Sequence, residues 1–203
     1  PFYIFFVQYE TIVALTVTLL AAGMILVGVI SMVILGSVRN SLVLVANLVL
    51  IIVNIMGWMA IIGISLNAVS LVNLLICLGL SVEFSIHLFK HFNFNEEEGE
   101  ASRDDSKTNR AYGSLVYIGS TTLGGITLTK LIGIGVLSFT KSQIFRVYYF
   151  KMWAGLIIIA SVHALVVAPI LLGRFGSPTV YGRSTYSRVV DDSGLRRRRN
   201  SVY

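Results

Sequence analysis

The feature that most constrains this chain is a run of 43 consecutive uncharged residues, from Asn40 to Val82. A second uncharged run extends from Thr11 to Val38. A helix needs about 20 apolar residues to cross a bilayer, so the longer run is long enough for two passes. Only 13% of the residues are charged, against roughly 25% in soluble domains. The pattern predicts an all-α, polytopic membrane protein.

The hydropathy pattern predicts a five-helix transmembrane region over residues 12–172. Its helices cover about 12–38, 42–62, 71–89, 114–137 and 147–172. Residues 1–11 are expected to end a lumenal domain and to lie at the membrane interface. Residues 93–110 are expected to form a cytosolic loop, and residues 173–203 a disordered, basic cytosolic tail. The chain opens without Met or a basic segment, which is typical of a piece of a longer protein.

Basic residues predict the orientation of these helices, because cytosolic loops are enriched in Lys and Arg. Five passes place twelve basic residues on one side and three on the other. The twelve are Arg39, Lys90, Arg103, Lys107, Arg110, Arg174, Arg183, Arg188 and Arg196–Arg199, and the three are Lys141, Arg146 and Lys151. We therefore expect the C-terminal tail to be cytosolic and the N-terminal end to be lumenal or external.

Two titratable residues stand in the third predicted span, within the stretch "GLSVEFSIH". Glu83 lies near the middle of the bilayer, and His87 lies one helical turn closer to the cytosol on the same face. An ionised carboxylate at this depth costs a few kcal/mol, so it marks a functional site by default. We interpret the two as a proton relay that drives transport. The alternative is a structural hydrogen-bonded pair that holds helices together.

Other polar residues within the spans are candidates for supporting roles. Lys130 lies close enough to the end of the fourth span to extend its amine to the interface, to form an ion pair, or to join the relay. Thr127, Thr129 and Asn73 are expected to form hydrogen bonds between helices, which usually serve packing. The glycines of the fourth span predict close helix packing or, alternatively, a segment that moves during transport.

Several classes of function are not indicated. The chain carries no nucleotide-binding loop, no zinc-ligand spacing and no nucleophile elbow, so we expect neither an enzyme nor a bound cofactor or metal. The net charge of +6 resides mostly in the tail and fits membrane orientation better than nucleic-acid binding. Cys77 is the single cysteine and lies within a predicted span, so no disulfide is expected.

Two long stretches give the chain a family resemblance. "GISLNAVSLVNLLICLGLSVEFSIH" (Gly63–His87) and "GGITLTKLIGIGVLSFTKSQIFRVYYFKM" (Gly124–Met152) are similar to the Niemann–Pick type C1 family of the resistance-nodulation-division superfamily. Patched-type receptors resemble the helix of Glu83 and His87 too, but "TKSQIF" followed by "YYFKM" favours the sterol transporters. The loop at 93–110 and the tail lie outside the resemblance.

The resemblance implies a fold and a function. Superfamily members have two six-helix halves, and this chain would be the last five helices of the second half. The helix of Glu83 would match the helix whose ionisable groups couple proton movement to transport. The implied partners are a sterol, the bilayer, the N-terminal half of the same protein and a sterol carrier protein in the lumen. The implied location is the membrane of the lysosome, late endosome or fungal vacuole.

Two other hypotheses remain open at this point. One is a Patched-like sterol-responsive receptor or sensor, whose helices bind sterol to regulate a partner. The other gives Glu83 and His87 a structural role only.

Overall fold

The computed structural model describes residues 3–94 and 103–177, and these are almost entirely helical. The first three helices are α1 (Tyr3–Leu35), α2 (Val38–Ile61) and α3 (Ala68–Phe94). The first turn between them uses Gly36 at φ +61°, and the Ser37 hydroxyl then caps α2 by accepting a hydrogen bond from the Asn40 amide.

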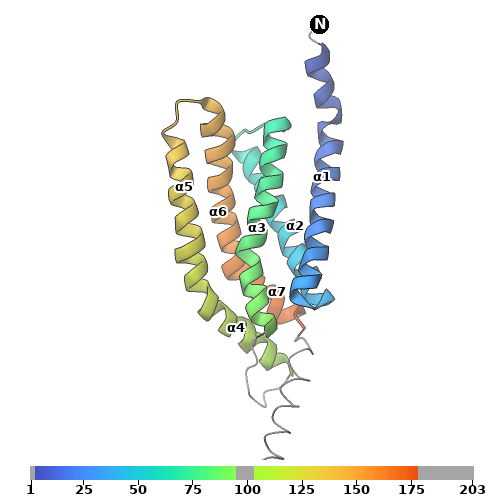
Figure 1. Cartoon of the computed structure of the whole chain (residues 1–203), viewed down its shortest axis with the longest axis vertical. Coiled ribbons are helices and arrows are strands. Elements are labelled where there is room, and N and C mark those ends of the chain that lie inside the picture. Colours follow the sequence, from blue (N-terminus) through green and yellow to red (C-terminus); the bar gives the residue numbers. More distant parts are fainter. Residues whose placement is uncertain (1–2, 95–102, 178–203) are drawn as a thin grey trace, which may run out of the picture.

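The remaining helical segments include three π-helical stretches. They are α4 (Arg103–Thr121), η1 (Thr122–Leu128), α5 (Thr129–Ser138), η2 (Phe145–Lys151), α6 (Met152–Val162), η3 (His163–Val167) and α7 (Ala168–Phe175). Figure 1 shows α4 continuing into α5 as one bent column, and α6 continuing into α7 as another. The N-terminus lies at the end of the bundle opposite α7 (Figure 1).

The membrane character predicted from the sequence is confirmed. In the part of the chain that the structure describes, four helical stretches are long and apolar enough to cross a bilayer. These are Glu10–Leu35, Val38–Ile61, Ala68–Asn93 and Phe145–Phe175, and Thr129–Ser138 is a shorter apolar helix. The fourth predicted span, 114–137, corresponds to the column of α4, η1 and α5, whose apolar part is divided by the π-helical stretch. The count of five spans therefore stays a prediction.

The predicted loop at 93–110 and the predicted tail at 173–203 both begin or end in helix. α3 continues to Phe94 and α4 begins at Arg103, so both ends of the segment predicted as a loop, 93–110, are helical. The segment contains the good helix formers Arg103, Lys107 and Arg110, which are compatible with a helix that begins at Arg103. α7 continues to Phe175 within the predicted tail. The predictions for residues 95–102 and 178–203 lie outside the described residues.

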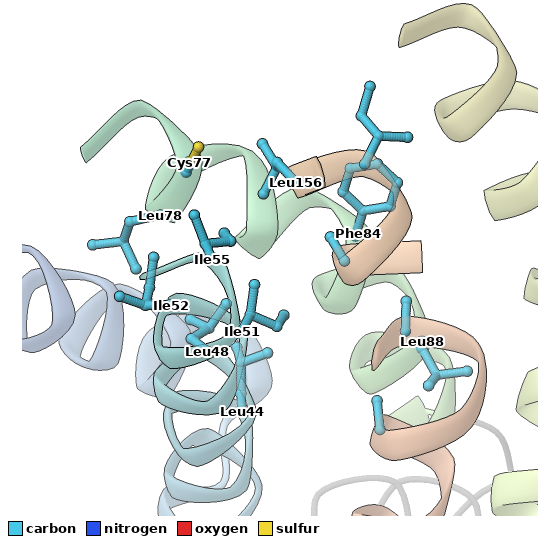
Figure 2. Packing of buried hydrophobic residues seen from close by; sticks show 14 of the residues in the cluster. Leu44, Leu48, Ile51, Ile52, Ile55, Cys77, Leu78, Phe84, Leu88 and Leu156 are labelled. Atoms are coloured by element: carbon cyan, nitrogen blue, oxygen red, sulfur yellow. The ribbon is translucent and has the colours of Figure 1, made fainter. Parts of the chain in front are cut away.

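The packed core lies where α2 faces α3 and α6. One face of α2 presents Leu44, Leu48, Ile51 and Ile55, which are fully buried, toward Cys77 and Leu78 of α3 (Figure 2). α1 packs on the outside of this core, and only 11% of its apolar stretch is buried. Lipid is as apolar as these side chains, so shape complementarity and polar contacts, rather than burial from water, hold such helices together.

Close helix contacts occur at glycines other than those expected. A Cβ added at Gly23 of α1 would lie 2.8 Å from the Leu78 side chain, and one at Gly155 of α6 would lie 2.2 Å from the Trp58 indole nitrogen. In contrast, Gly124 and Gly125 in η1 have no atom within 4 Å of such a Cβ. Among the described residues, the close packing predicted for the fourth span is thus not seen at these two glycines, whereas Gly119 of the same span has the Leu165 side chain 3.6 Å from such a Cβ.

Candidate functional site

The open face of α3 carries the two titratable residues singled out by the sequence. Glu83 and His87 are both exposed, and they belong to a stripe of exposed positions that follows one side of the helix. The spacing of three and four residues places the whole stripe on one face. Its members are Val72, Ile76, Gly79, Glu83, His87 and Lys90.

Glu83 has a partner that local sequence patterns did not assign. The Lys130 amine of α5 forms an ion pair with the Glu83 carboxylate of α3, and the two residues are 47 positions apart in the sequence. The Glu83 side chain is 46% exposed and that of Lys130 is 21% exposed. Lys130 also lies over the ring of the buried Phe84, with its amine 5.3 Å from the ring centre. The pair is neutral as a whole, which lowers the cost of keeping a carboxylate inside a membrane span.

An apolar cavity borders this ion pair. It has a volume of about 310 Å³ and lies among α3, α5 and α6. Lys130 lines it together with Ile76, Leu80, Gly133, Ile134, Leu137, Trp153, Leu156 and Ile157. The Lys130 side of the ion pair is therefore next to a space lined mostly by apolar side chains.

The supporting polar residues are not brought to the ion pair. Thr127 lies 3.0 Å from the Ser161 hydroxyl, a hydrogen bond between η1 and α6. Asn73 is fully buried and donates to the Tyr148 carbonyl of η2 at 3.2 Å. Thr129 is exposed. The structure thus places Thr127 and Asn73 in contacts between helices, and both lie apart from the contacts of Glu83.

On the opposite side of α3 lies a polar cluster that the sequence analysis missed, in which Asn47, Ser85 and His163 are buried and Asn54 is exposed. Asn47 of α2 donates to the Ser85 hydroxyl at 3.1 Å and accepts from the His163 ring at 3.3 Å. Asn54 donates to the other ring nitrogen of His163 at 3.0 Å. The available signal was the presence of asparagines and a histidine inside apolar spans, which are rarely without a partner. Their pairing depends on how α2, α3 and η3 pack.

A second set of amide contacts closes the end of the bundle at α7. The side-chain amide of Asn40 donates through Nδ2 to the Asn93 side chain of α3 and to the Ser177 backbone carbonyl. Its Oδ1 accepts from the Ser177 backbone amide at 2.8 Å. Arg39 donates to the Phe175 carbonyl at 2.7 Å. The start of α2, the end of α3 and the end of α7 are thereby held together at the same end of the bundle. This is the end that the charge distribution assigns to the cytosol.

The described residues contain no group of three or more His, Cys, Asp or Glu side chains that could hold a metal ion. The ionisable groups gathered at the open face of α3 are one carboxylate, one imidazole and two amines, from Glu83, His87 and Lys90 of α3 and from Lys130 of α5.

Comparison with known proteins gives the lineage of the chain. Over 185 residues it is 38% identical to the NPC intracellular cholesterol transporter 1 homolog 1b of Drosophila melanogaster, a match that covers 91% of the chain. It is also 38% identical to the NPC intracellular cholesterol transporter 1 of Sus scrofa, over 86% of the chain. The chain belongs to the Niemann–Pick type C1 family.

A further relative supports this membership, and the lengths of the relatives show how much of them the chain spans. The human NPC1-like intracellular cholesterol transporter 1 is 32% identical over 85% of the chain. The chain spans between 12% and 14% of the length of these relatives. No protein-family model matches it. The family resemblance inferred from the two long stretches is confirmed, and it covers a fragment of the relatives' length.

Proposed function

We propose that the chain forms part of an intracellular sterol transporter in which protonation of Glu83 is coupled to sterol movement out of the lumen. The family membership supports the sterol as substrate, because the relatives are named cholesterol transporters. The observation that carries proton coupling is the Glu83–Lys130 ion pair on an exposed face of a membrane helix. A charged pair facing hydrocarbon is costly, so a protein partner is expected to cover it.

The partner we infer is the other half of the same protein. The exposed stripe on α3 extends from Val72 to Lys90, long enough to pack along a second helix. Small and branched residues, Val72, Ile76 and Gly79, flank the charged part and allow close approach. Glu83 and Lys130 would then lie between two halves of a complete transporter.

The proton step follows from the charges of the pair. A proton that binds the Glu83 carboxylate neutralises it and releases the Lys130 amine from its partner. The freed amine then needs another acceptor, which changes the packing of α5 against α3. His87 lies one turn further along the same face, where its imidazole can pass a proton to or from Glu83. Proton binding thereby biases two arrangements of the helices, which is the basis of coupled transport.

The location follows from the same proposal. A transporter that uses protons to move sterol from the lumen requires an acidic compartment. We therefore place the protein in the lysosomal, late-endosomal or vacuolar membrane, with the C-terminus in the cytosol. A lumenal sterol carrier protein would deliver the substrate. The relatives are named transporters, so the comparisons offer no support for the receptor hypothesis.

The test uses the complete protein that contains this chain, reconstituted in liposomes with an imposed pH gradient. Glu83→Gln removes the titratable group while keeping the size, and sterol transfer should fall at least tenfold and lose its dependence on the gradient. Lys130→Met should reduce transfer similarly. Lys141→Met serves as the control, because Lys141 is an exposed lysine in the turn between α5 and η2. Gradient-dependent transfer that persists in Glu83→Gln would show that Glu83 is not the coupling group.

A further inference from the structure

His163 is a titratable residue that the proposed coupling step does not use. It is buried, and it begins the π-helical stretch η3 within the span Phe145–Phe175. Both ring nitrogens are engaged by asparagines of α2: Nε2 is 3.0 Å from Asn54 Nδ2, and Nδ1 is 3.3 Å from Asn47 Oδ1. π-helical stretches of this kind often occur at functional sites.

The hydrogen bonds specify one protonation state of the ring. Asn47 donates through Nδ2 to the Ser85 hydroxyl, so its Oδ1 is the atom that faces His163 as an acceptor. Asn54 donates through Nδ2 to the Leu50 carbonyl as well as toward His163. Nδ1 therefore carries the hydrogen and Nε2 offers its lone pair. The neutral ring with hydrogen on Nδ1 satisfies both contacts.

The groups around His163 do not favour a positive charge. The segment η3, which His163 begins, packs against α2, α3, α6 and α7. The charged or titratable side chains on these elements are Arg39 on α2, Glu83, His87, Lys90, His91 and Cys77 on α3, and Arg174 on α7. Arg39 bonds to the Phe175 carbonyl, Glu83 to Lys130 and His91 to Ser114. Within the described residues, the recorded hydrogen-bond partners of His163 are two neutral amides.

We propose that His163 is a proton-binding site, separate from the Glu83–Lys130 pair, whose occupation opens the contact between α2 and η3. A proton from the aqueous phase would bond to the Nε2 lone pair, and no covalent bond breaks. The new N–H then faces the Nδ2 group of Asn54, which is also a donor. Either the Asn54 amide rotates and loses its bond to the Leu50 carbonyl, or the imidazolium leaves its place between the helices.

The consequence reaches the end of the bundle. η3 leads directly into α7, and the backbone at the end of α7 bonds to Arg39 at the start of α2. Besides their apolar packing, α2 and the η3–α7 segment share polar contacts at two places: the His163 ring, and the contacts of Arg39 and Asn40 at the end of α7. When the His163 contact opens, the contact between Arg39 and the Phe175 carbonyl would remain and act as a hinge.

The first measurement is of the ring itself, by solid-state nuclear magnetic resonance of the complete protein in lipid with ¹⁵N-labelled histidine. The His163 signal is assigned as the one lost in His163→Gln. At pH 7.5 we expect hydrogen on Nδ1 and a bare Nε2, and by pH 5 both nitrogens protonated. Hydrogen on Nε2 at pH 7.5, or a bare Nε2 that persists to pH 4.5, would overturn the proposal.

A variant of Asn54 tests the site without removing the histidine. Asn54→Asp provides a carboxylate acceptor beside Nε2, and the doubly protonated signal should appear at least one pH unit higher, a tenfold gain in proton affinity. Asn67→Asp is the control, because Asn67 contacts Tyr148 and lies outside the recorded contacts of His163. An unchanged titration in Asn54→Asp would contradict the assigned contact.

The conformational step is tested by hydrogen exchange of the η3 amides. Between pH 7.5 and pH 5, after correction for intrinsic rates, protection should fall about tenfold in the unmodified protein. His163→Gln keeps one donor and one acceptor but cannot bind the proton, so its protection should stay constant; an equal fall in both would refute the opening step. Neither measurement monitors sterol, and Glu83→Gln should leave both unchanged, so failure here is separable from failure of the proposed transport function.

Discussion

The two sides of α3 solve the problem of polar groups in a membrane differently. On the buried side, Asn47 forms neutral hydrogen bonds both to Ser85, which is fully buried, and to His163. On the open side, Glu83 and Lys130 are charged and remain partly exposed. The neutral groups complete their contacts inside this chain. The charged groups are left where a further partner can reach them, which suits a structural role for one side and a changing role for the other.

The largest effect on stability is expected on the buried side. Asn47→Leu leaves the Ser85 hydroxyl and the His163 Nδ1–H without their recorded partner in the core, and unsatisfied buried groups cost about 1–3 kcal/mol each. We expect the free energy of unfolding of the complete protein in lipid nanodiscs to fall by about 3 kcal/mol. Val49→Leu, at an exposed position of the same helix, is the control. Equal stability of the two variants would mean that the buried cluster is not a structural element.

The next largest effect on stability is expected from adding a methyl group on the buried side of α3, where space is tight, rather than on the open side. Gly23→Ala directs a methyl group against Leu78 on the buried side of α3, and overpacking of this kind costs about 1–3 kcal/mol. The flexible end of Leu78 can yield, so we expect a loss of about 1 kcal/mol in thermal unfolding. Gly79→Ala lies on the open side, where no atom of the described chain is within 4 Å, and should lose no stability within the isolated bundle. A loss at Gly79 in the complete protein would indicate that a partner covers this side.

A smaller effect is expected at the hydrogen bond between η1 and α6. Thr127→Val removes the contact with Ser161, and hydrogen bonds between membrane helices contribute about 0.6 kcal/mol on average. Thr129→Val changes an exposed threonine two residues away and should have no measurable effect on unfolding. If both variants lose the same stability, helix propensity rather than the hydrogen bond is responsible.

The smallest effect on stability is expected at the charged pair. Replacing both partners, in Glu83→Leu with Lys130→Met, removes attraction and desolvation cost together, so stability should change by less than about 1 kcal/mol. Sterol transfer should still be lost, because the carboxylate proposed to bind the coupling proton is gone. A double variant that unfolds readily would favour the structural hypothesis for the pair and weaken the contrast between the two sides of α3.

Local patterns in the sequence determined much of this molecule. Uncharged runs longer than a bilayer span predicted the membrane helices, because backbone groups in lipid must bond within the helix. A spacing of four residues placed Glu83 and His87 on one face. Two long stretches predicted the family, which the comparisons confirmed. None of these inferences requires knowledge of how one helix packs on another.

Only the tertiary structure decided which polar groups meet. Lys130 had three open interpretations until α5 was placed beside α3, and no sequence pattern indicated which of Asn47, Asn54, Ser85 and His163 would pair. Periodicity reports the face of a helix that a residue occupies, but partners 38 to 116 residues apart depend on the crossing angle and axial register of two helices. Those quantities are set by the side chains of both helices together, so they appear only when the bundle is assembled.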